Sequence, residues 1–559
     1  MPPTLADAAS AVRRWWGYAA LHAAQRRAIA AVLAGRDTLV VMPTGGGKSL
    51  CFQVPALLLD RMTVVLSPLV SLMKDQVDAL ARRGIAAACL HGGMAPAEQA
   101  DVLARALNGG VRLLYLAPER LATGRTLAAL GRTCPALLAV DEAHCVSEWG
   151  HDFRPAYRDV LAIRRALGMP PAMALTATAT PDVRRDIEET CGLREPVRVI
   201  SGFDRANLRY SVIRVSSARQ REAHLAALLE RRNGTALVYA QARSRVERIA
   251  ASLRRSGVPA AAYHAGQPAD LRRRTQDRLM RNEIGAVVAT SAFGMGVDKP
   301  DVRLVVHDAI PPSLESYYQE AGRAGRDGAP ADCVLLYARG DRHAPEHFIR
   351  SATPSRRLVE AVARAAAECA PHGLIDVTAV ARAVRAPPSH AAGALAILQR
   401  AGFVVHDPGN RNAVWVRLLA TRARVEALRE PDGYGRELVN ALVDVTRGAV
   451  SCGTEIPLDA LPPGLGHVGL GAALDGLQAA SILVWRRPGS GLRLAACVPT
   501  PPLGPGDWAA LDARRARSEA RLAAMARYAE SRSCRRQVLL GYFGERPRRI
   551  PCGGCDRCG

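Results

Sequence analysis

A glycine-rich run between an apolar strand and a helix is the feature that most constrains how this chain can fold. Residues 42–49 read Met-Pro-Thr-Gly-Gly-Gly-Lys-Ser and directly follow the apolar run that begins at Thr38. The backbone N–H groups of such a loop, with the N-terminus of the next helix, hold phosphates. Lys48 would reach the β- and γ-phosphates, and the hydroxyl of Ser49 would help to hold Mg²⁺. The general motif has glycine at the position that Met42 occupies in this chain. The predicted phosphate cradle consists of Thr44, Gly45, Gly46 and Gly47.

Two further motifs describe a site that is split between two domains. Asp141 and Glu142 follow the apolar run 137–140. At a strand end, the first carboxylate can bind Mg²⁺ and the second can polarise the attacking water. Residues 319–326 read Gln-Glu-Ala-Gly-Arg-Ala-Gly-Arg, and paired arginines suit the spread charge of a transferring phosphoryl group. We therefore predict an ATPase in which hydrolysis closes and opens a cleft between two domains.

Short apolar runs alternate with helical patterns over two successive stretches of the chain. This alternation predicts an α/β fold with two tandem, doubly wound parallel sheets, because buried parallel strands need helical crossovers. We expect the first domain over residues 1–202 and the second over 203–342, with a linker near 201–207. The expected strands are 38–42, 62–66, 113–116, 137–140 and 173–176 in the first domain, and 236–239, 260–263, 286–289, 303–306 and 333–336 in the second.

The charge balance favours a polyanionic partner. Lys and Arg number 75 against 52 Asp and Glu in 559 residues, a formal net charge of +23. Counterion release makes nucleic acid the first candidate and an acidic membrane surface the second, while an arginine-rich composition without a functional cause is the alternative. The N-terminus lacks the apolar core of a signal peptide, and no run approaches the ~18 apolar residues of a membrane span. We expect a cytoplasmic, nucleoid-associated protein with no membrane partner.

An aromatic and glutamine motif precedes the glycine-rich run. Residues 16–25 read Trp-Gly-Tyr-Ala-Ala-Leu-His-Ala-Ala-Gln. Together with the motifs above, they resemble a superfamily 2 helicase of the RecQ family, and the resemblance extends over residues 16–337. It implies that the two sheets are RecA-like, that Tyr18 stacks on the adenine and that Gln25 bonds the edge of the base. The family normally has arginine where this chain has His22.

The same resemblance assigns roles to several other runs. Residues 66–76, 176–178 and 289–298 match family motifs that line the DNA path and link the two sheets. The run 319–326 matches the family's final motif. This match implies that Arg326 is an arginine finger, that Arg323 accompanies it on the γ-phosphate, and that Gln319 belongs to the same catalytic motif.

The run 145–157 resembles the aromatic-rich loop by which RecQ enzymes sense single-stranded DNA and couple it to hydrolysis. Aromatic faces can stack on bases and an arginine can add charge. The alternative is that the two aromatic residues are ordinary core, and the family's usual glutamine is replaced here by Glu148. The residues expected to couple DNA to the ATP site are Trp149, His151, Asp152, Phe153 and Arg154.

After residue 342 the α/β alternation stops. Residues 355–419 predict three helices and a hairpin whose strands, 403–405 and 414–416, flank a turn at 408–410. This is the outline of a winged helix, which we place over 343–420; a small helical domain without DNA contact is the alternative. A second winged-helix-like or bracing domain is expected over 421–505. The candidate phosphate contacts are His390, Arg400 and Arg411.

Four cysteines near the end of the sequence have metal-binding spacing. Seventeen residues separate Cys534 from Cys552, and two residues separate Cys552 from Cys555 and Cys555 from Cys558. Four thiolates at this spacing suit a closed tetrahedral zinc site, and a redox Cys-x-x-Cys is the alternative. The run 534–545 also resembles the RecQ zinc module. The order differs from most of the family, because the winged-helix candidate lies between the motor and the cysteines; a RecQ-like branch has the zinc module at the C-terminus.

We expect a helix-plus-zinc module over residues 506–559. It has too little apolar material for a core of its own, so bound zinc would supply the missing folding free energy. Replacing Cys555 is expected to release the metal and weaken DNA binding, while basal hydrolysis by the motor survives. The basic residues that this module is expected to present to DNA are Arg532, Arg535 and Arg536.

The sequence thus predicts an ATP-dependent DNA helicase that translocates on single-stranded DNA and unwinds duplexes in repair or recombination. The 3′→5′ polarity is implied by the family resemblance. The expected partners are single-stranded and partially duplex DNA, with single-strand-binding or recombination proteins, and the cofactors are ATP, Mg²⁺ and Zn²⁺. Two alternatives stay open: an RNA helicase of the same superfamily, and a winged-helix DNA-binding regulator with a vestigial motor.

Overall fold

The structure, a computed structural model, describes the greater part of the chain as two compact units. The first comprises Met1–Glu346 and Arg517–Gly559, and the second comprises His347–Ala516. Among the described helices, none has both the length and the apolar character that a membrane span would require. The described residues are 3–121, 124–147, 154–293, 299–368, 375–406, 413–419, 438, 440–442, 454–461, 467–479, 482–486, 491–495, 503–547 and 551–559.

The first unit contains two sheet domains. In the first of these domains the described residues form a parallel sheet of seven strands in the order β3-β4-β2-β5-β6-β1-β7. Successive side chains of a strand enter opposite cores: Leu39 and Val41 pack in one, and Val40 packs in the other. Such burial on both faces is what a doubly wound sheet requires. The strands are β1 (Thr38–Val41), β2 (Thr63–Leu66), β3 (Ala87–Leu90), β4 (Leu113–Leu116), β5 (Leu137–Val140), β6 (Ala172–Thr176) and β7 (Val197–Ile200).

Helices cover both faces of this sheet. Buried side chains of α2, α3 and α4 share the core that contains Val40, while those of α5, α7 and α8 share the core that contains Leu39. The phosphate loop follows β1 and leads directly into α3. The helices are α1 (Leu5–Trp16), α2 (Ala23–Leu33), α3 (Leu50–Leu58), α4 (Val70–Ala81), α5 (Pro96–Leu107), α6 (Gly124–Gly131), α7 (Val160–Ala166) and α8 (Pro181–Thr190).

The second domain has the same architecture. Its described strands form a six-stranded parallel sheet in the order β10-β11-β9-β12-β13-β8. Both expected parallel sheets are therefore confirmed. The strands are β8 (Leu208–Arg214), β9 (Thr235–Tyr239), β10 (Ala260–Tyr263), β11 (Ala286–Ala289), β12 (Val302–His307) and β13 (Ala331–Tyr337). The helices are α9 (Ala218–Glu230), α10 (Arg243–Arg255), α11 (Ala269–Met280) and α12 (Leu314–Ala321).

Three strands, β3, β7 and β8, were not expected from the sequence. Each lies at the edge of its sheet. Buried positions alternate or mix with partly or fully exposed ones along them, as in β7, where only Val199 is buried. An edge strand has one open side and partial exposure, so it lacks the continuous apolar run by which a central parallel strand is recognised.

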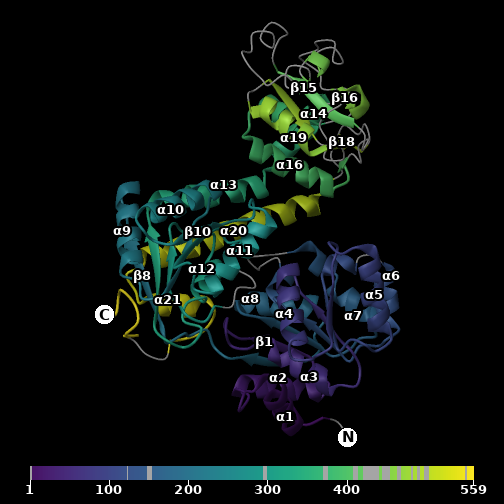
Figure 1. Cartoon of the computed structure of the whole chain (residues 1–559), viewed down its shortest axis with the longest axis vertical. Helices are drawn as coiled ribbons and strands as arrows, with labels where there is room; N and C mark the ends of the chain where they lie inside the picture. Colours follow the sequence, from purple (N-terminus) through teal and green to yellow (C-terminus); the bar gives the residue numbers. More distant parts are fainter. Residues whose placement is uncertain are drawn as a thin grey trace. The chain divides into compact units, whose positions relative to one another are not determined.

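The C-terminal segment packs on the motor domains. Helix α20 (Pro505–Glu530) precedes α21 (Arg535–Tyr542), which Figure 1 shows in yellow beside the teal strands and helices of the second domain. Leu539, Phe543 and Cys555 are buried in the same core as side chains of both sheets. The tail also hydrogen-bonds to the open edge of β8: Tyr210 donates its N–H to the carbonyl of Gly554 at 3.1 Å. The described residues of the module therefore form no core of their own, as expected, and instead belong to the motor core.

The second unit contains one core built largely from helices. Helix α13 (His343–Ala352) leads into it, followed by α14 (Arg356–Glu368), α15 (Val377–Ala383) and α16 (Pro388–Arg400). Strand β14 (Val404–His406) pairs antiparallel with β18 (Leu492–Leu494), and both pack on these helices. The helix-helix-helix outline agrees with the expectation from the sequence.

The expected hairpin between residues 403–405 and 414–416 is wrong. Strand β15 (Ala413–Leu418) does not pair with β14 but lies between β16 (Thr454–Pro457) and β17 (Leu483–Arg486). Its apolar residues join a separate core with α19 (His467–Ala479). Each strand pairs within the core that buries its apolar side chains. A local sequence pattern cannot distinguish these cores, because 413–418 and 492–494 are both short and mainly apolar.

Candidate ATP site and zinc centre

The phosphate loop has the backbone conformation that its glycines make possible. Gly45 and Gly47 have φ angles of 83° and 71°, values that side-chain-bearing residues rarely adopt. A Cβ atom on Gly47 would lie 2.4 Å from Nε2 of Gln25, and one on Gly46 would lie 3.0 Å from the carbonyl oxygen of Pro43. The loop is therefore closely packed as well as strained, and both properties require glycine.

The two residues expected to recognise the base lie next to this loop. Nε2 of Gln25 donates to the carbonyl of Gly47 at 3.2 Å, and its Oε1 accepts from the N–H of His22 at 2.9 Å. Gln25 is thereby fixed between the start of α2 and the phosphate loop. Tyr18 is 53% exposed, so its ring has a free face for stacking.

Lys48 is partly buried among the groups with which it would act. Its Nζ donates to the carbonyl oxygens of Met42 at 3.2 Å and Pro43 at 3.4 Å. Burial lowers the pKa of Lys48, and the nearby carboxyls of Glu142 and Asp141 oppose that shift. The ammonium group therefore lies in a poorly solvated position, where a phosphate would be a strong partner.

The acidic pair lies at the end of β5, as the sequence predicts. Burial, followed by repulsion from Glu142, raises the pKa of Asp141 to about 7. Glu142 has a φ of 48° and donates its N–H to Oδ1 of Asp141 at 3.0 Å. Its Oε2 lies 3.3 Å from Nδ1 of His144, whose ring also contacts Oγ1 of Thr176 at 3.0 Å. The left-handed backbone of Glu142 is rare for a residue with a side chain, and its carboxylate lies beside the ring of His144.

The second domain contributes side chains to the same site. Nε2 of Gln319 donates to Oγ1 of Thr178 in the first domain at 3.4 Å. A Cβ atom on Gly45 would lie 3.6 Å from Cγ of Arg326, so this arginine lies directly against the phosphate loop. Arg323 is buried nearby: burial raises the pKa of Tyr239, and the positive charge of Arg323 partly opposes that rise. The fold thus brings residues 319–326 to the loop at 42–49, as a split site requires.

Sequence reasoning missed Arg205, which joins the two halves of the site. It lies in the segment expected to be a linker, yet its guanidinium donates to the carbonyl of Thr44 at 3.1 Å and to that of Gly322 at 3.3 Å. It also donates to Ala324 at 3.1 Å and Gly325 at 2.7 Å. Its only sequence signal is a polar run, Asp204-Arg-Ala-Asn207, which reads like an ordinary linker.

Four of the five residues expected to couple DNA to the ATP site lie outside the described residues, namely Trp149, His151, Asp152 and Phe153, and so does Glu148. Arg154 is described. Its guanidinium donates to the carbonyl of Pro68, within the run 66–76, and its N–H donates to the carbonyl of Cys145 at 3.0 Å. The end of the loop is therefore attached to a second run that resembles a DNA-path motif.

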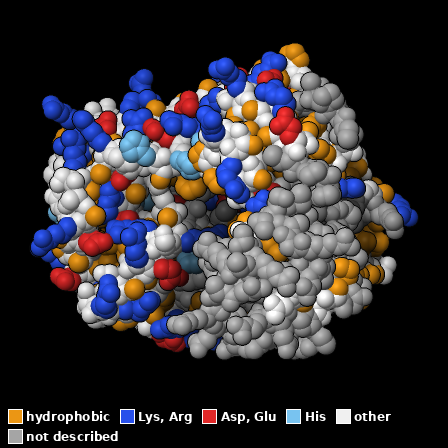
Figure 2. All heavy atoms as spheres, turned by 90° about the horizontal axis from the view of Figure 1, so that it is seen from above, with side chains coloured by type: hydrophobic (Ala, Val, Ile, Leu, Met, Phe, Trp, Pro, Cys, Tyr) orange, Lys and Arg blue, Asp and Glu red, His pale blue; other side chains and the backbone are white. Residues whose placement is uncertain are grey.

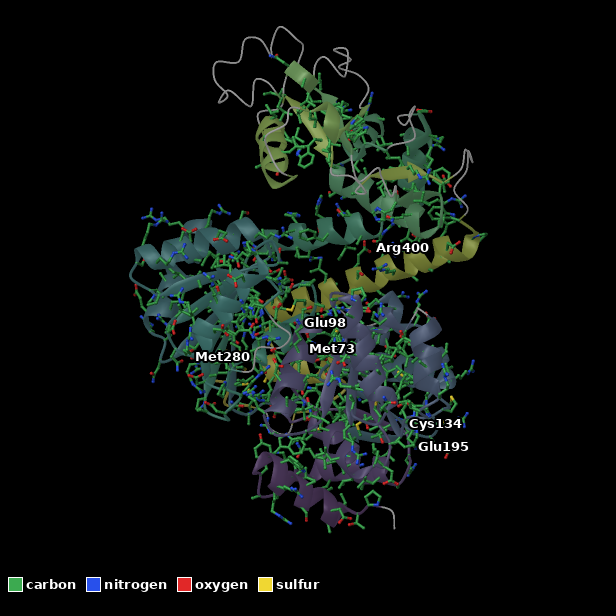
Figure 3. The ribbon with its side chains drawn as sticks, turned by 45° about the vertical axis from the view of Figure 1, so that its right-hand side comes forward. Met73, Glu98, Cys134, Glu195, Met280 and Arg400 are labelled. Carbon is green, nitrogen blue, oxygen red and sulfur yellow. The ribbon has the colours of Figure 1, made fainter. Side chains whose placement is uncertain are left out.

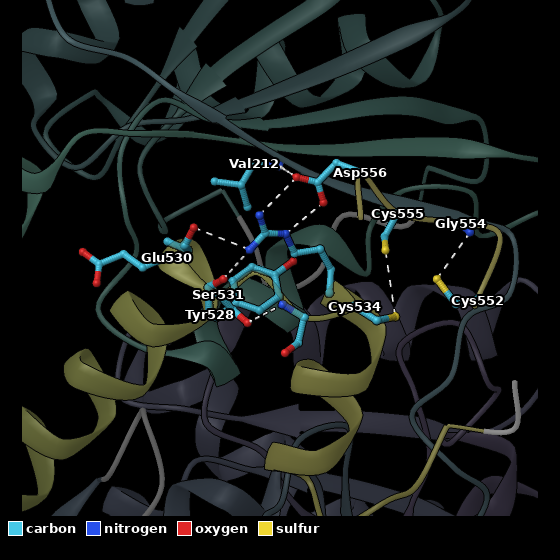
Figure 4. A network of polar contacts seen from close by, with 12 residues as sticks. Val212, Tyr528, Glu530, Ser531, Cys534, Cys552, Gly554, Cys555 and Asp556 are labelled. Atoms are coloured by element: carbon cyan, nitrogen blue, oxygen red, sulfur yellow. Dashed lines mark hydrogen bonds and ion pairs between the residues drawn. The ribbon is translucent and has the colours of Figure 1, made fainter. Parts of the chain in front are cut away.

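The four cysteines converge at the C-terminus. The sulfur atoms of Cys534, Cys552, Cys555 and Cys558 all lie within 4.8 Å of one another, and those of Cys534 and Cys555 are 3.9 Å apart. Tetrahedral zinc with bonds of about 2.3 Å requires sulfur atoms about 3.8 Å apart. Figure 4 shows the Cys534–Cys555 contact and the N–H of Gly554 donating to the sulfur of Cys552. This arrangement fits zinc.

Two of the three arginines expected to face DNA instead face inward. Arg535 is fully buried and binds both carboxylate oxygens of Asp556, at 2.8 and 3.1 Å, as well as the carbonyl of Tyr528. Arg536 is 3% exposed and pairs with Asp204. Only Arg532 of this set is exposed. Both buried arginines are paired with carboxylates, as charges removed from water require.

The second unit presents only part of its predicted DNA contacts. Arg400, labelled in Figure 3, is exposed at the end of α16, whereas the ring of His390 stacks on His347 with centroids 4.8 Å apart. Arg411 lies outside the described residues. Figure 2 shows many basic side chains, drawn blue, distributed over the face in view with acidic ones among them. The excess positive charge is thus displayed on the surface.

Known proteins share these features. Three family models match successive parts of the chain: DEAD/DEAH box helicase over residues 22–187, helicase conserved C-terminal domain over 220–328, and RecQ zinc-binding over 507–559. The crystal structure of DUF1998 helicase MrfA bound to DNA has a similar fold, with a TM-score of 0.51 and 20% identity over 61% of this chain and 52% of that chain. Fold and site therefore define a helicase-type protein with two RecA-like domains and a zinc-binding domain.

Similar curated proteins indicate which family of helicases the chain belongs to. The ATP-dependent DNA helicase RecQ of Pasteurella multocida (strain Pm70) is 44% identical over 326 residues, which are 58% of this chain and 51% of that protein. The probable ATP-dependent DNA helicase RecS of Bacillus subtilis (strain 168) is 37% identical over 338 residues, 60% of this chain and 68% of that protein. The chain belongs to the RecQ family of helicases. It spans about half the length of several of the RecQ proteins that it matches.

Proposed function

We propose that this protein is an ATP-dependent DNA helicase that translocates 3′→5′ on single-stranded DNA and unwinds duplexes. The observation that carries the proposal is the approach of Arg326 to Gly45 across the two domains. An arginine from one domain against the phosphate loop of the other makes the site complete only when the domains are together. Relatives described as ATP-dependent DNA helicases support the substrate.

Each site residue has a role in hydrolysis. Tyr18 and Gln25 would bind the base, and the cradle from Thr44 to Gly47 would bind the phosphates with Lys48. Ser49 and Asp141 would hold Mg²⁺, which supplies positive charge to the β- and γ-phosphates. Glu142 would polarise the attacking water. Arg323 and Arg326 would stabilise the charge that develops on the γ-phosphate, with Gln319 linking their loop to Thr178.

Hydrolysis would be converted into movement on DNA. Loss of the γ-phosphate would remove the anionic partner of Lys48 and Arg326, so the domains would separate and change their grip on the backbone. The loop that ends at Arg154 would report bound single strands to the ATP site. Its attachment at Pro68 supports this role, because both runs resemble DNA-path motifs. The predicted winged helix would open the duplex.

Zinc and the cellular context complete the proposal. Cys534, Cys552, Cys555 and Cys558 would hold one structural zinc ion, supported by their mutual distances. The domain boundaries expected from the sequence remain part of the proposal. So do a role in repair or recombination, a cytoplasmic location at the nucleoid, and single-strand-binding or recombination proteins as partners.

One experiment tests the proposal against both alternatives. ATP hydrolysis and strand displacement are measured on 3′-tailed, 5′-tailed, forked and Holliday-type DNA and on matched RNA substrates. We expect DNA-stimulated hydrolysis, with displacement on 3′-tailed and forked DNA and little on 5′-tailed DNA. Stronger stimulation by RNA would favour the RNA helicase. DNA binding without hydrolysis would favour a regulator with a vestigial motor.

A further inference from the structure

Arg205 spans the two loops that form the ATP site. One terminal nitrogen donates to Thr44 in the phosphate loop and to Gly322, while the other donates to Ala324 and Gly325. All four acceptors are backbone carbonyls. Arg205 therefore holds the main chain of the two loops in place, and does not merely orient a neighbouring side chain. The loop that it holds carries Arg323 and Arg326. A planar guanidinium with several donors in a rigid fork suits such a four-point contact, and an ammonium does not.

The backbone on either side of Arg205 is held by the zinc module. One terminal nitrogen of Arg536 pairs with Asp204 and donates to the carbonyl of Arg205 at 2.8 Å; the other donates to the carbonyl of Leu208 at 2.7 Å. Arg536 is therefore attached to both sides of the linker residue that reaches the ATP site. Because Arg536 is buried, breaking these contacts would leave an unpaired charge inside the protein.

The cysteine cluster determines where Arg536 lies. Cys534 immediately precedes α21, and Arg536 lies in the first turn of that helix. The tail that carries the other cysteines passes so close that a Cβ atom on Gly554 would lie 2.8 Å from Arg536. Holding Cys534 and the tail together on one metal ion would therefore fix both sides of this arginine.

We propose that Arg205 is a positioning residue for ATP hydrolysis and that Arg536 of the zinc module holds it in place. This inference rests on the proposed ATPase function. In this arrangement the zinc module keeps the linker in position, the linker keeps Arg205 in position, and Arg205 sets Arg323 and Arg326 relative to the phosphate loop. Zinc would thus support turnover at a site in which it takes no chemical part.

The test is a comparison of kcat, KM for ATP, zinc content and melting temperature in the full-length protein. The variants are Arg205→Met, Arg205→Lys, Arg536→Met, Arg536→Lys and the double Met variant. Arg205→Met should lower kcat roughly tenfold or more while KM for ATP stays within about threefold, because the phosphate loop still binds nucleotide but the arginine loop is misplaced. Arg205→Lys should restore little of the loss, since lysine cannot span four carbonyls.

Arg536→Met should reproduce this kinetic pattern while one zinc ion per chain is still bound. The double variant should be no slower than the more impaired single variant, because two residues acting through one path give non-additive effects. Arg214→Met is the matched control: Arg214 also joins β8 to the C-terminal segment, through the carbonyl of Glu530 at 3.2 Å, but it does not touch the linker. Its kcat should equal that of the parent.

Several results would overturn the inference. Unchanged kcat in Arg205→Met, or additive losses in the double variant, would show that the two arginines act separately or not at all. A loss of zinc and melting temperature in Arg536→Met that Arg536→Lys rescues together with kcat would mean that Arg536 only supports folding. A parent that hydrolyses no ATP would overturn the proposed function and this inference together, whereas an active parent with active variants overturns this inference alone.

Discussion

Gln319 in the second sheet domain donates a hydrogen bond of 3.4 Å to the hydroxyl of Thr178 in the first. These residues belong to the runs 319–326 and 176–178, which are far apart in sequence. Their contact places the loop of Arg323 and Arg326 beside the phosphate loop and the acidic pair. Hydrolysis is therefore expected to depend on contacts between the domains as well as on the residues that touch ATP.

Replacing Arg326 tests the arginine finger. Arg326→Ala should abolish most hydrolysis while nucleotide binding is largely kept, because the guanidinium acts on charge that develops only in the transition state. Arg326→Lys should recover little, since the fork is lost. Fluorescent-nucleotide binding and steady-state hydrolysis provide the readouts, with exposed Arg339→Ala as the control. Turnover within a few-fold of the parent would remove Arg326 from this role.

Replacing Lys48 separates ATP chemistry from DNA binding. Lys48→Ala should abolish hydrolysis and leave single-stranded DNA affinity near that of the parent, because the ammonium group of Lys48 contacts the carbonyls of the phosphate loop. Hydrolysis and fluorescence anisotropy with a labelled oligonucleotide measure the two effects. Arg105→Ala, which breaks only an exposed ion pair with Asp101, should change neither. A matching fall in DNA affinity would argue against this separation.

The coupling loop is tested by the ratio of two rates. Arg154→Ala or Trp149→Ala should lower DNA-stimulated hydrolysis more than basal hydrolysis, because the loop is proposed to report bound DNA and not to bind ATP. Both rates are measured for each variant and for Arg165→Ala, an exposed arginine on α7. Equal losses of the two rates would indicate that the loop is structural.

Zinc removal should destabilise the motor as well as the tail. Cys555→Ser should release the metal and lower the melting temperature, since structural zinc supplies on the order of 10 kcal/mol and Cys555 lies in the core shared with both sheets. Basal hydrolysis should fall too, in contrast to the independent motor expected from the sequence. Elemental analysis, melting curves and hydrolysis are compared with Cys134→Ser, which replaces an exposed cysteine. A zinc-free variant with the parent's stability would contradict this prediction.

The raised pKa of Asp141 predicts pH-dependent binding of Mg²⁺–nucleotide. Its value of about 7 lies above the ordinary 3.8, so below about pH 7 the nucleotide-free protein holds Asp141 as the protonated acid. The protonated acid stabilises the folded protein, and this contribution is lost as the pH rises through about 7. Bound Mg²⁺ requires the carboxylate. The rise in melting temperature caused by Mg²⁺ with a non-hydrolysable ATP analogue should therefore grow between about pH 6 and about pH 8. Asp141→Asn should remove this trend, and a parent that shows no trend would contradict the assignment.

The sequence by itself was enough to predict the chemistry proposed for the site. Phosphate binding needs a fixed local order of glycines, lysine and hydroxyl, so residues 42–49 could be recognised without a fold. Four thiolates at short spacing likewise identify the zinc centre, because their chemistry depends on ligand type and count. Central strands such as β5 could also be predicted from the sequence. A strand that is buried on both faces is a continuous apolar run, which is visible without a fold.

Only the tertiary structure decided which segments meet. The pairing of β14 with β18, the role of Arg205, and the inward orientation of Arg535 and Arg536 all depend on partners distant in sequence. A polar run can be a solvated linker or a set of buried donors, and its residues are the same in both cases. The difference is whether another part of the chain removes water and supplies acceptors, and that is settled when the cores form.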